Sequence, residues 1–234
     1  NDAIAKLSEA TAPLMKSLKV GAGESEYTLG GETVLFRHEK TLVSRNRFAV
    51  SFCDSMSEEA IDAKIANMKL VDYIRIGEEM KVEFALVKYN GNKDAYVSLI
   101  NKLKSSELKI AYIIDCEDAA VAKEAVALLE GTNPIVYGAN KDNYNEMIEV
   151  VKASSLEELY STVEAIQAAG YKELVLDVTG ENIKDTYTNA VQVRRISLKE
   201  QDRTFGYPSI VFANKLSNNN PMMEVALSSV FTIK

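Results

Sequence analysis

The chain has 234 residues, a net charge of −7 at neutral pH and 47% hydrophobic residues, which is an ordinary globular composition. The acidic balance argues against a nucleic-acid partner, because proteins that bind the phosphate backbone usually present a basic face. No apolar run approaches the roughly 20 residues of a membrane helix, and the amphipathic residues 1–16 lack the apolar region of a signal peptide, so no membrane partner is expected.

The first predicted element is a β-hairpin near the N-terminus. Two β-rich runs, SEYTL and ETVLFR, flank Gly30–Gly31, and such a glycine pair predicts a hairpin over about residues 25–37. A charged run follows, and it includes the only histidine of the chain: Arg37, His38, Glu39 and Lys40. The structural interpretation is a strand that leaves the core with arginine–carboxylate pairs, and the functional alternative is a partner or cofactor contact. No catalytic triad is expected, because His38 lacks the required neighbours.

From residue 48 onward, predicted strands alternate with predicted helices. The strand candidates are residues 48–53, 82–89, 109–115, 134–139, 173–178 and 208–213. The helix candidates are residues 57–68, 94–103, 118–129, 142–152, 155–169, 181–199 and 221–231. Ser57 followed by two glutamates is a typical helix start, and Gly131 and Gly170 are typical helix ends.

This alternation predicts an α/β fold with a parallel sheet, since each helix connects two strands in the same direction. The strand candidates are nearly continuous apolar runs, as expected for strands buried on both faces. Six such strands are found, whereas a (β/α)8 TIM barrel has eight. We expect a barrel that lacks its fifth strand, near residues 152–155, and its eighth strand, after Lys234. A six-stranded doubly wound sheet is the alternative. Residues 1–47 would form an N-terminal segment, and residues 48–234 a partial barrel domain.

Polar residues recur just after the predicted strands. They are Asp54, Lys88, Asp115, Asn140, Asp177 and Asn214. In a barrel they would surround the C-terminal face, where active sites lie. Aspartate and asparagine also cap helices and fill turns, so the structural interpretation is favoured for each of them. The sequence has no glycine-rich phosphate loop, no GxSxG and no HExxH motif.

The chain has two cysteines, Cys53 and Cys116, which lie far apart in apolar runs. We therefore expect no disulfide and no all-protein metal site. Two cysteines cannot supply the four thiolates that an iron–sulfur cluster usually takes. This cysteine usage fits a reducing, cytoplasmic location.

Four stretches closely resemble the large (gamma) subunit of the corrinoid iron–sulfur protein of the acetyl-CoA synthase/decarbonylase system. In chain order they are GGETVLFRHEKT (30–41), YGANKDNYNEM (137–147), ELVLDVTGENI (173–183) and QVRRISLKEQDRTFGYPSIVF (192–212). The likeness covers nearly the whole chain. In that family the first stretch is a hairpin before the first barrel strand, which implies an inter-domain contact by Arg37–Lys40 rather than catalysis.

The resemblance implies a methyl carrier of the reductive acetyl-CoA pathway. Such a carrier takes a methyl group from a methyltetrahydropterin, of folate or methanopterin type, onto cobalt and delivers it to acetyl-CoA synthase. The family's corrinoid (cobalamin) and 4Fe-4S cluster would both be bound outside this chain, which would then be a non-catalytic barrel domain. The implied partners are a small (delta/beta-type) barrel subunit, a methyltransferase and acetyl-CoA synthase.

An alternative function is that of a pterin-binding methyltransferase, which shares the barrel architecture. Those enzymes hold the pterin with aspartate and asparagine at strand ends. Asp115, Asn140 and Asp177 are similarly placed after the third, fourth and sixth predicted strands. A third hypothesis, an unrelated barrel enzyme that acts on a sugar or a phosphate, is disfavoured because the sequence has no phosphate-binding motif.

Overall fold

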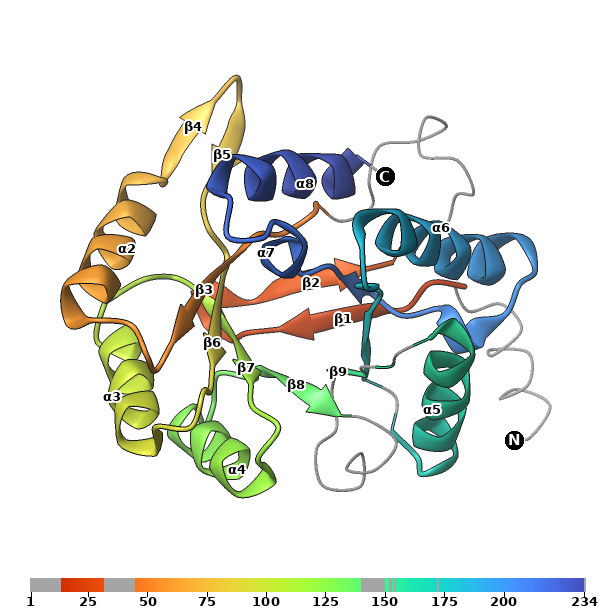
Figure 1. The fold of residues 1–234 in the computed structure, drawn as a ribbon, viewed down its shortest axis with the longest axis horizontal. Helices are drawn as coiled ribbons and strands as arrows, with labels where there is room; N and C mark the ends of the chain where they lie inside the picture. Colours follow the sequence, from red (N-terminus) through yellow and green to blue (C-terminus); the bar gives the residue numbers. More distant parts are fainter. Residues whose placement is uncertain are drawn as a thin grey trace. The chain divides into compact units, whose positions relative to one another are not determined.

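The structure is a computed structural model that describes residues 14–31, 45–139, 150–151, 153, 155–171 and 173–233. The chain divides into two compact units. Unit 1 comprises residues 1–18, 29–45 and 152–234, and unit 2 comprises residues 19–28 and 46–151. Figure 1 shows the elements of both units in chain order.

Unit 2 contains five parallel strands. They are β3 (Ala49–Cys53), β6 (Phe84–Lys88), β7 (Ala111–Asp115), β8 (Ile135–Ala139) and β9 (Val150–Val151). Their order in the sheet is β9–β8–β7–β6–β3, so each strand pairs with the preceding strand of the series along the chain. The predicted α/β class with a parallel sheet is therefore confirmed.

Three helices follow the first three of these strands. They are α2 (Glu58–Leu70), α3 (Lys93–Lys104) and α4 (Ala119–Leu128). Each begins after a side chain that accepts a hydrogen bond from the backbone of the first turn, supplied by Ser57, Asn92 and Asp118 respectively. These caps satisfy backbone N–H groups that have no partner inside the helix. The predicted helix start at Ser57 is confirmed.

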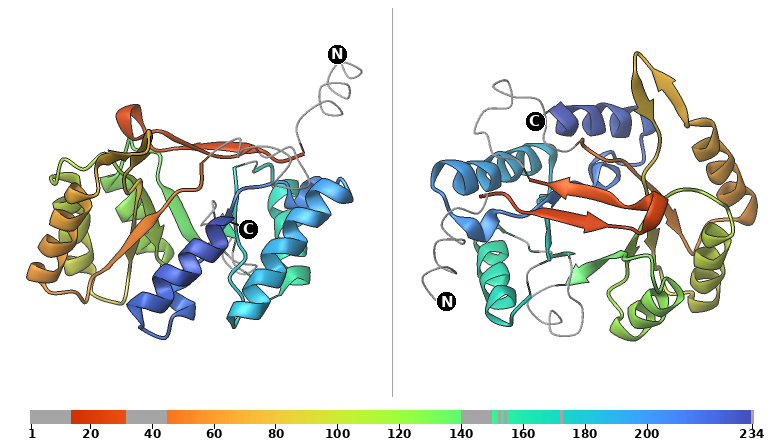
Figure 2. Two further views of the ribbon diagram at one scale, coloured as in Figure 1. Left: turned by 90° about the horizontal axis from the view of Figure 1, so that it is seen from above. Right: turned by 180° about the vertical axis from the view of Figure 1, so that it is seen from behind.

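The core of unit 2 lies between the sheet and these three helices. Alternate strand residues, such as Val87 and Ile114, pack in one cluster with α2, α3 and α4. Strand residues of the other parity, such as Leu86 and Ile113, are also buried but do not belong to this cluster. The three helices therefore pack on the same face of the sheet, on the outer side of β6 and β7 in Figures 1 and 2.

Unit 1 contains the parallel pair β10 (Val175–Asp177) and β11 (Ser209–Ile210). Its helices are α5 (Leu156–Ala168), α6 (Ile183–Lys199), the short η3 (Arg203–Phe205), α7 (Ala213–Leu216) and α8 (Pro221–Ile233). The predicted strands, and the predicted helices over residues 155–169, 181–199 and 221–231, are confirmed. Across the described ranges, no helix combines the length and apolarity that a membrane span requires.

One prediction about the barrel strands is wrong. Val150 and Val151 form strand β9, which pairs with β8 at Tyr137 and Ala139. The fifth strand is thus present where the sequence predicted the end of a helix over residues 142–152. A strand of two residues is too short to show the alternation of apolar and polar residues that predicts a strand from the sequence. Adjacent β-branched valines do favour an extended backbone. With β9, the described residues hold seven parallel strands.

The N-terminal hairpin is present, but its strands differ from the prediction. Strand β2 (Tyr27–Gly30) pairs with β1 (Ser17–Val20), and the short helix η1 (Gly23–Ser25) connects them. Gly21 begins this connection with a φ of 87°, and a Cβ there would lie 1.8 Å from the Ser25 carbonyl oxygen, so only glycine fits. Residues 32–44, which include the far side of the predicted hairpin, lie outside the described residues.

A second hairpin in unit 2 was not predicted. Strands β4 (Tyr73–Arg75) and β5 (Glu78–Met80) are antiparallel, and Ile76–Gly77 forms the turn between them. All six strand residues are exposed, and the hairpin projects from the rest of unit 2 (Figure 1). The turn has neither Asn-Gly nor Asp-Gly, the dipeptides that mark such turns in a sequence.

Candidate functional site

Three polar residues stand at the C-terminal ends of neighbouring strands in unit 2, as predicted. Asp54 follows β3, and Lys88 and Asp115 end β6 and β7 in matching register. The Asp54 amide donates to the Lys88 carbonyl at 3.4 Å, and the Tyr89 amide donates to the Asp115 carbonyl at 2.8 Å. Asp54 and Asp115 are each only 7% exposed, whereas Lys88 is exposed. The three residues therefore lie in a row along one edge of the sheet.

The Asp54 carboxylate organises the loop after β6. Its Oδ2 accepts hydrogen bonds from the backbone N–H groups of Asn90 and Asn92, both at 2.9 Å. Asn92 in turn caps α3 by accepting from the Ala95 amide. The Asp54 Oδ1 is buried and has no hydrogen-bond partner in the part of the chain that the structure describes. These contacts give Asp54 a structural role in positioning the loop and α3.

Two further ionisable groups behind this edge, Tyr96 and Cys116, are neutral. The Tyr96 hydroxyl is buried and donates to the Val87 carbonyl at 3.1 Å. Burial raises the pKa of Tyr96, and the neighbouring Cys116, Asp115 and Asp54 raise it further. Burial also raises the pKa of the Cys116 thiol to about 11, and its Sγ donates to a backbone carbonyl at 3.3 Å. At neutral pH neither group supplies a nucleophile or a thiolate ligand.

In unit 1, Asp177 ends β10 and is buried. Its Oδ1 accepts from the Thr179 amide at 2.9 Å, and the Thr179 hydroxyl accepts from the Phe212 amide at 2.9 Å. The Asp177 carboxylate therefore shapes the loop that follows its own strand. Asp115 and Asp177 belong to different units, and Asn140 lies outside the described residues. Their grouping into one site stays a prediction.

The charged run of Arg37, His38, Glu39 and Lys40 also lies outside the described residues. Its predicted role in an inter-domain contact is therefore untested. A different charged cluster is described in unit 2, at the N-terminal ends of the strands.

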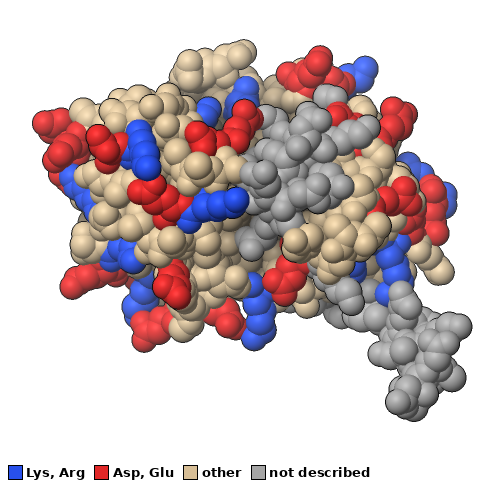
Figure 3. Space-filling view, turned by 90° about the horizontal axis from the view of Figure 1, so that it is seen from below, with Lys and Arg blue, Asp and Glu red and all other residues tan. Residues whose placement is uncertain are grey.

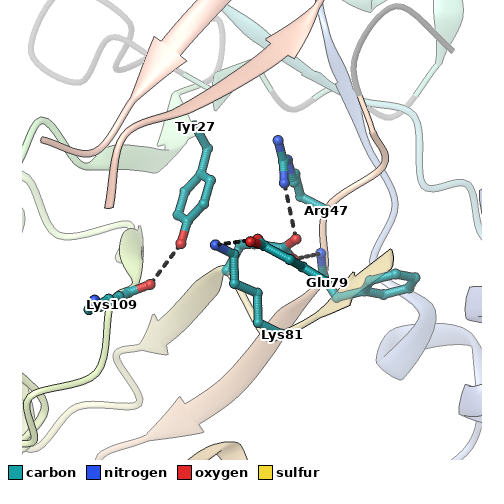
Figure 4. A network of polar contacts seen from close by, with 7 residues as sticks. Tyr27, Arg47, Glu79, Lys81 and Lys109 are labelled. Atoms are coloured by element: carbon teal, nitrogen blue, oxygen red, sulfur yellow. Dashed lines mark hydrogen bonds and ion pairs between the residues drawn. The ribbon is translucent and has the colours of Figure 1, made fainter. Parts of the chain in front are cut away.

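This cluster centres on Glu83, which directly precedes β6 and is 1% exposed. Its Oε1 lies 3.1 Å from the Arg47 Nη1, and its Oε2 accepts from the Phe48 amide at 3.2 Å (Figure 4). Phe48 directly precedes β3, so one buried carboxylate connects the starts of two adjacent strands. Buried carboxylates require such pairing, because an isolated charge away from water is very unfavourable.

The tip of the β1–β2 hairpin packs on this cluster. The Tyr27 ring lies 5.1 Å from the Arg47 guanidinium and 5.6 Å from the Phe84 ring. The Tyr27 hydroxyl donates to the Lys109 carbonyl at 2.7 Å, just before β7 (Figure 4). Lys81 lies 5.6 Å from the same ring and pairs with Glu79. The hairpin tip is thus held at the N-terminal ends of β6 and β7.

Arg47 and Glu83 are not among the site residues predicted from the sequence. The available signal was Glu83 near the start of the strand candidate 82–89, followed by the apolar run 84–87. A carboxylate in such a run usually has a buried partner.

The comparison with protein families decides the assignment of the chain. A family model described as "CO dehydrogenase/acetyl-CoA synthase delta subunit" matches residues 17–230. The chain belongs to this family. The family match extends from β1 to near the end of α8, and thus covers strands and helices of both units.

Relatives within the CO dehydrogenase/acetyl-CoA synthase group bear the names of large or gamma subunits. The chain is 28% identical over 228 residues to the corrinoid/iron-sulfur protein large subunit of Moorella thermoacetica, covering 94% of this chain and 50% of that protein. It is 28% identical over 256 residues to the acetyl-CoA decarbonylase/synthase complex subunit gamma 2 of Methanosarcina mazei, covering 99% of this chain and 53% of that protein. The chain therefore spans about half the length of these relatives. The resemblance to the gamma subunit is confirmed.

The name of the Moorella relative raises the question of whether this family member could itself hold an iron–sulfur cluster. The present chain has two cysteines. Cys53 is half-buried with its Sγ 3.2 Å from the Ser55 hydroxyl, and Cys116 is buried and protonated. Such clusters usually take four thiolates. Within the described ranges, no group of three or more His, Cys, Asp or Glu side chains is placed to hold a metal ion. The two cysteines of this chain therefore do not fit the four-thiolate ligand set of an iron–sulfur cluster.

Proposed function

We propose that this chain is the barrel domain of a corrinoid iron–sulfur methyl carrier. The observation that carries the proposal is the family match over residues 17–230, together with relatives named as corrinoid/iron-sulfur large subunit and complex subunit gamma. The complete carrier would take methyl groups from a methyltetrahydropterin, of folate or methanopterin type, and deliver them to acetyl-CoA synthase in the reductive acetyl-CoA pathway.

In this proposal the corrinoid and the 4Fe-4S cluster are bound by domains outside this chain. The chain spans about half of the relatives, and its two cysteines are too few for the cluster. Residues 1–47 then form an N-terminal segment, and residues 48–234 the barrel domain. Arg37, His38, Glu39 and Lys40 are proposed to contact a neighbouring domain through charge-assisted hydrogen bonds.

Two features of unit 2 support a TIM barrel over a doubly wound sheet. Its strands pair in the order in which they occur along the chain, without the reversal of a doubly wound sheet. Helices α2, α3 and α4 pack on the same face, whereas a doubly wound sheet has helices on both faces. We propose that the seven described parallel strands are the first seven of a (β/α)8 barrel.

The domain is proposed to act as a scaffold rather than as a catalyst. Asp54 accepts hydrogen bonds from the loop after β6, and Asp177 accepts one from the loop after its own strand. Tyr96 and Cys116 are neutral. The proposed partners are the small delta/beta-type barrel subunit, a methyltransferase and acetyl-CoA synthase, in the cytoplasm. On the face drawn in Figure 3, lysine and arginine side chains are interspersed with aspartate and glutamate. Such interspersed charge is typical of an ordinary solvated surface and favours no particular partner.

A pterin-binding methyltransferase is the second candidate. It is favoured by the burial of Asp115 and Asp177 at the C-terminal ends of their strands. Titration of the native protein with methyltetrahydrofolate and methyltetrahydromethanopterin separates the two functions. Binding that is lost in Asp115→Ala and Asp177→Ala variants with unchanged stability supports the enzyme.

The intact mass and the ultraviolet–visible spectrum of the native gene product test the carrier proposal. A mass well above 25.8 kDa with corrinoid and iron–sulfur absorbance supports it. A colourless protein of 25.8 kDa refutes it.

A further inference from the structure

The loop between β6 and α3 carries the only Asn-Gly pair of the sequence, Asn90–Gly91. Such a pair usually forms the turn of a β-hairpin, in which both residues have a positive φ. Here it joins a strand to a helix (Figure 1), and of the pair only Gly91 has a positive φ, of 110°. The backbone geometry therefore explains the glycine but not the asparagine that precedes it.

The Asn90–Gly91 pair is also open to a chemical reaction within the chain. The backbone nitrogen of the residue after an asparagine can attack the carbon of the side-chain amide. Glycine hinders this attack least, because it has no Cβ. Both residues of the pair are exposed, and a Cβ built on Gly91 would have no atom within 4 Å. No neighbouring group therefore crowds the reacting nitrogen.

The hydrogen bonds of the loop leave both reacting groups accessible. The backbone N–H groups of Asn90 and Asn92 donate to the Asp54 Oδ2, each at 2.9 Å. The Gly91 N–H, which lies between them in the chain, donates to no acceptor in the part of the chain that the structure describes. The Asn90 Nδ2 donates to the Ser55 Oγ at 3.4 Å, which is long for a hydrogen bond. The attack therefore breaks no strong hydrogen bond.

We propose that Asn90 is a site of spontaneous deamidation, in which the Gly91 nitrogen forms a bond to the Asn90 Cγ. The bond between Cγ and Nδ2 breaks, and the amino group leaves as ammonia with the proton of the Gly91 N–H. Water then adds to either carbonyl carbon of the cyclic succinimide and breaks its bond to the Gly91 nitrogen, which takes up a proton. Addition at Cγ gives aspartate. Addition at the backbone carbonyl gives isoaspartate, in which the main chain runs through Cβ and Cγ.

The isoaspartate product conflicts with the contacts that hold the loop. Its longer main chain lies between the N–H groups of residues 90 and 92, which share the Asp54 Oδ2. Asp54 is 7% exposed, and its Oδ1 already has no partner within the described ranges. Loss of either donor leaves this buried carboxylate less compensated, which is unfavourable. Because Asn92 caps α3 by accepting from the Ala95 amide, the modification also loosens the start of that helix.

Peptide mapping by mass spectrometry tests the proposal on the native protein incubated at mildly alkaline pH. Asn92 is the internal control, because it is exposed, lies in the same loop and donates to the same carboxylate, but precedes Lys93. We expect Asn90 to convert at least roughly tenfold faster than Asn92, since lysine has a Cβ and glycine does not. The rate at Asn90 in the folded protein should be within about tenfold of the rate in guanidinium chloride, because exposed loops open at little cost in free energy.

The Asn90→Gln variant separates this reaction from other changes during incubation. Glutamine keeps the amide and the backbone N–H, but it would have to form a larger ring and therefore reacts more slowly. The melting temperature of the wild type should fall as isoaspartate accumulates, whereas that of Asn90→Gln should stay constant. Equal conversion of Asn90 and Asn92 would overturn the proposal. So would conversion of Asn90 more than about a hundredfold slower in the folded than in the unfolded chain, because the fold would then protect this bond. A modified wild type with an unchanged melting temperature would refute the loosening of the loop.

Discussion

The buried Glu83–Arg47 pair gives the sharpest test of how unit 2 is stabilised. Replacing Glu83 with glutamine keeps the size and shape of the side chain but removes its charge. Glu83 is 1% exposed and Arg47 is 20% exposed, so the substitution leaves a largely buried guanidinium without its counter-charge. Hydrogen bonds to charged groups contribute about 1.5–3 kcal/mol, and breaking a fully buried pair costs about 3–5 kcal/mol. Because Arg47 retains some contact with water, we expect a loss of about 2 kcal/mol in the free energy of unfolding.

Urea unfolding followed by circular dichroism measures this loss, and amide exchange at Phe48 reports whether it is local. The exposed pair of Lys19 and Glu26, 2.8 Å apart, provides the matched control. Glu26→Gln should cost less than about 1 kcal/mol, because exposed ion pairs are screened by water. The Arg47→Gln, Glu83→Gln double variant should be at least about 1 kcal/mol more stable than the sum of the single variants predicts. A Glu83→Gln effect no larger than that of Glu26→Gln would refute the reasoning.

Three further predictions concern separate features of the chain. Gly21→Ala should destabilise the protein by more than about 2 kcal/mol, because its Cβ would lie 1.8 Å from the Ser25 carbonyl oxygen. Gly23→Ala is the control: a Cβ there has no atom within 4 Å, so this variant should cost only about 1 kcal/mol. Equal shifts in the melting temperatures of the two variants would contradict this prediction. The raised pKa of Cys116, about 11 against 9.0 for a free thiol, means that the unfolded chain loses this proton first. Stability should therefore fall as the pH rises from 9 to about 11, and a Cys116→Ala variant that loses stability equally over this range would disprove the assignment. Asp177→Ala should lower stability by about 1–3 kcal/mol, through the lost loop hydrogen bonds. Under the proposed scaffold function, the same variant should leave methyl transfer by the proposed carrier within about tenfold, and a well-folded variant with a hundredfold slower transfer would point to a catalytic role.

The elements of this fold that could be predicted from the sequence have strong local signals. Ser57 followed by two glutamates marked the start of α2, and its side chain accepts from the Ala60 amide. The apolar runs ending at Lys88 and Asp115 marked β6 and β7, which pair over their whole length. These segments are long enough for their apolar periodicity and their capping residues to predict the same secondary structure.

The missed elements are short or depend on distant contacts. Strand β9 has two residues, so its pairing with β8 sets its structure more than any local pattern does. The β4–β5 turn carries Ile76, which no turn rule favours. The Arg47–Glu83 pair joins residues 36 positions apart, so neither charge indicated the other in the sequence. At the strand ends, the positions of Asp115 and Asp177 could be predicted, but their loop contacts could not.

The Tyr27–Lys109 hydrogen bond has a consequence for the order of folding during synthesis. The two residues are 82 positions apart, which corresponds to about 4–16 s of translation at typical rates of roughly 5–20 residues per second. The hairpin tip therefore leaves the ribosome long before the start of β7, on which it packs, has been made. Although β1 and β2 are synthesised first, their docking at β7 cannot be complete until Lys109 has been made. In a nascent chain that stops before Lys109, the Tyr27 ring can already pack on Arg47 and Phe84, but its hydroxyl still lacks the Lys109 carbonyl that it donates to in the complete unit.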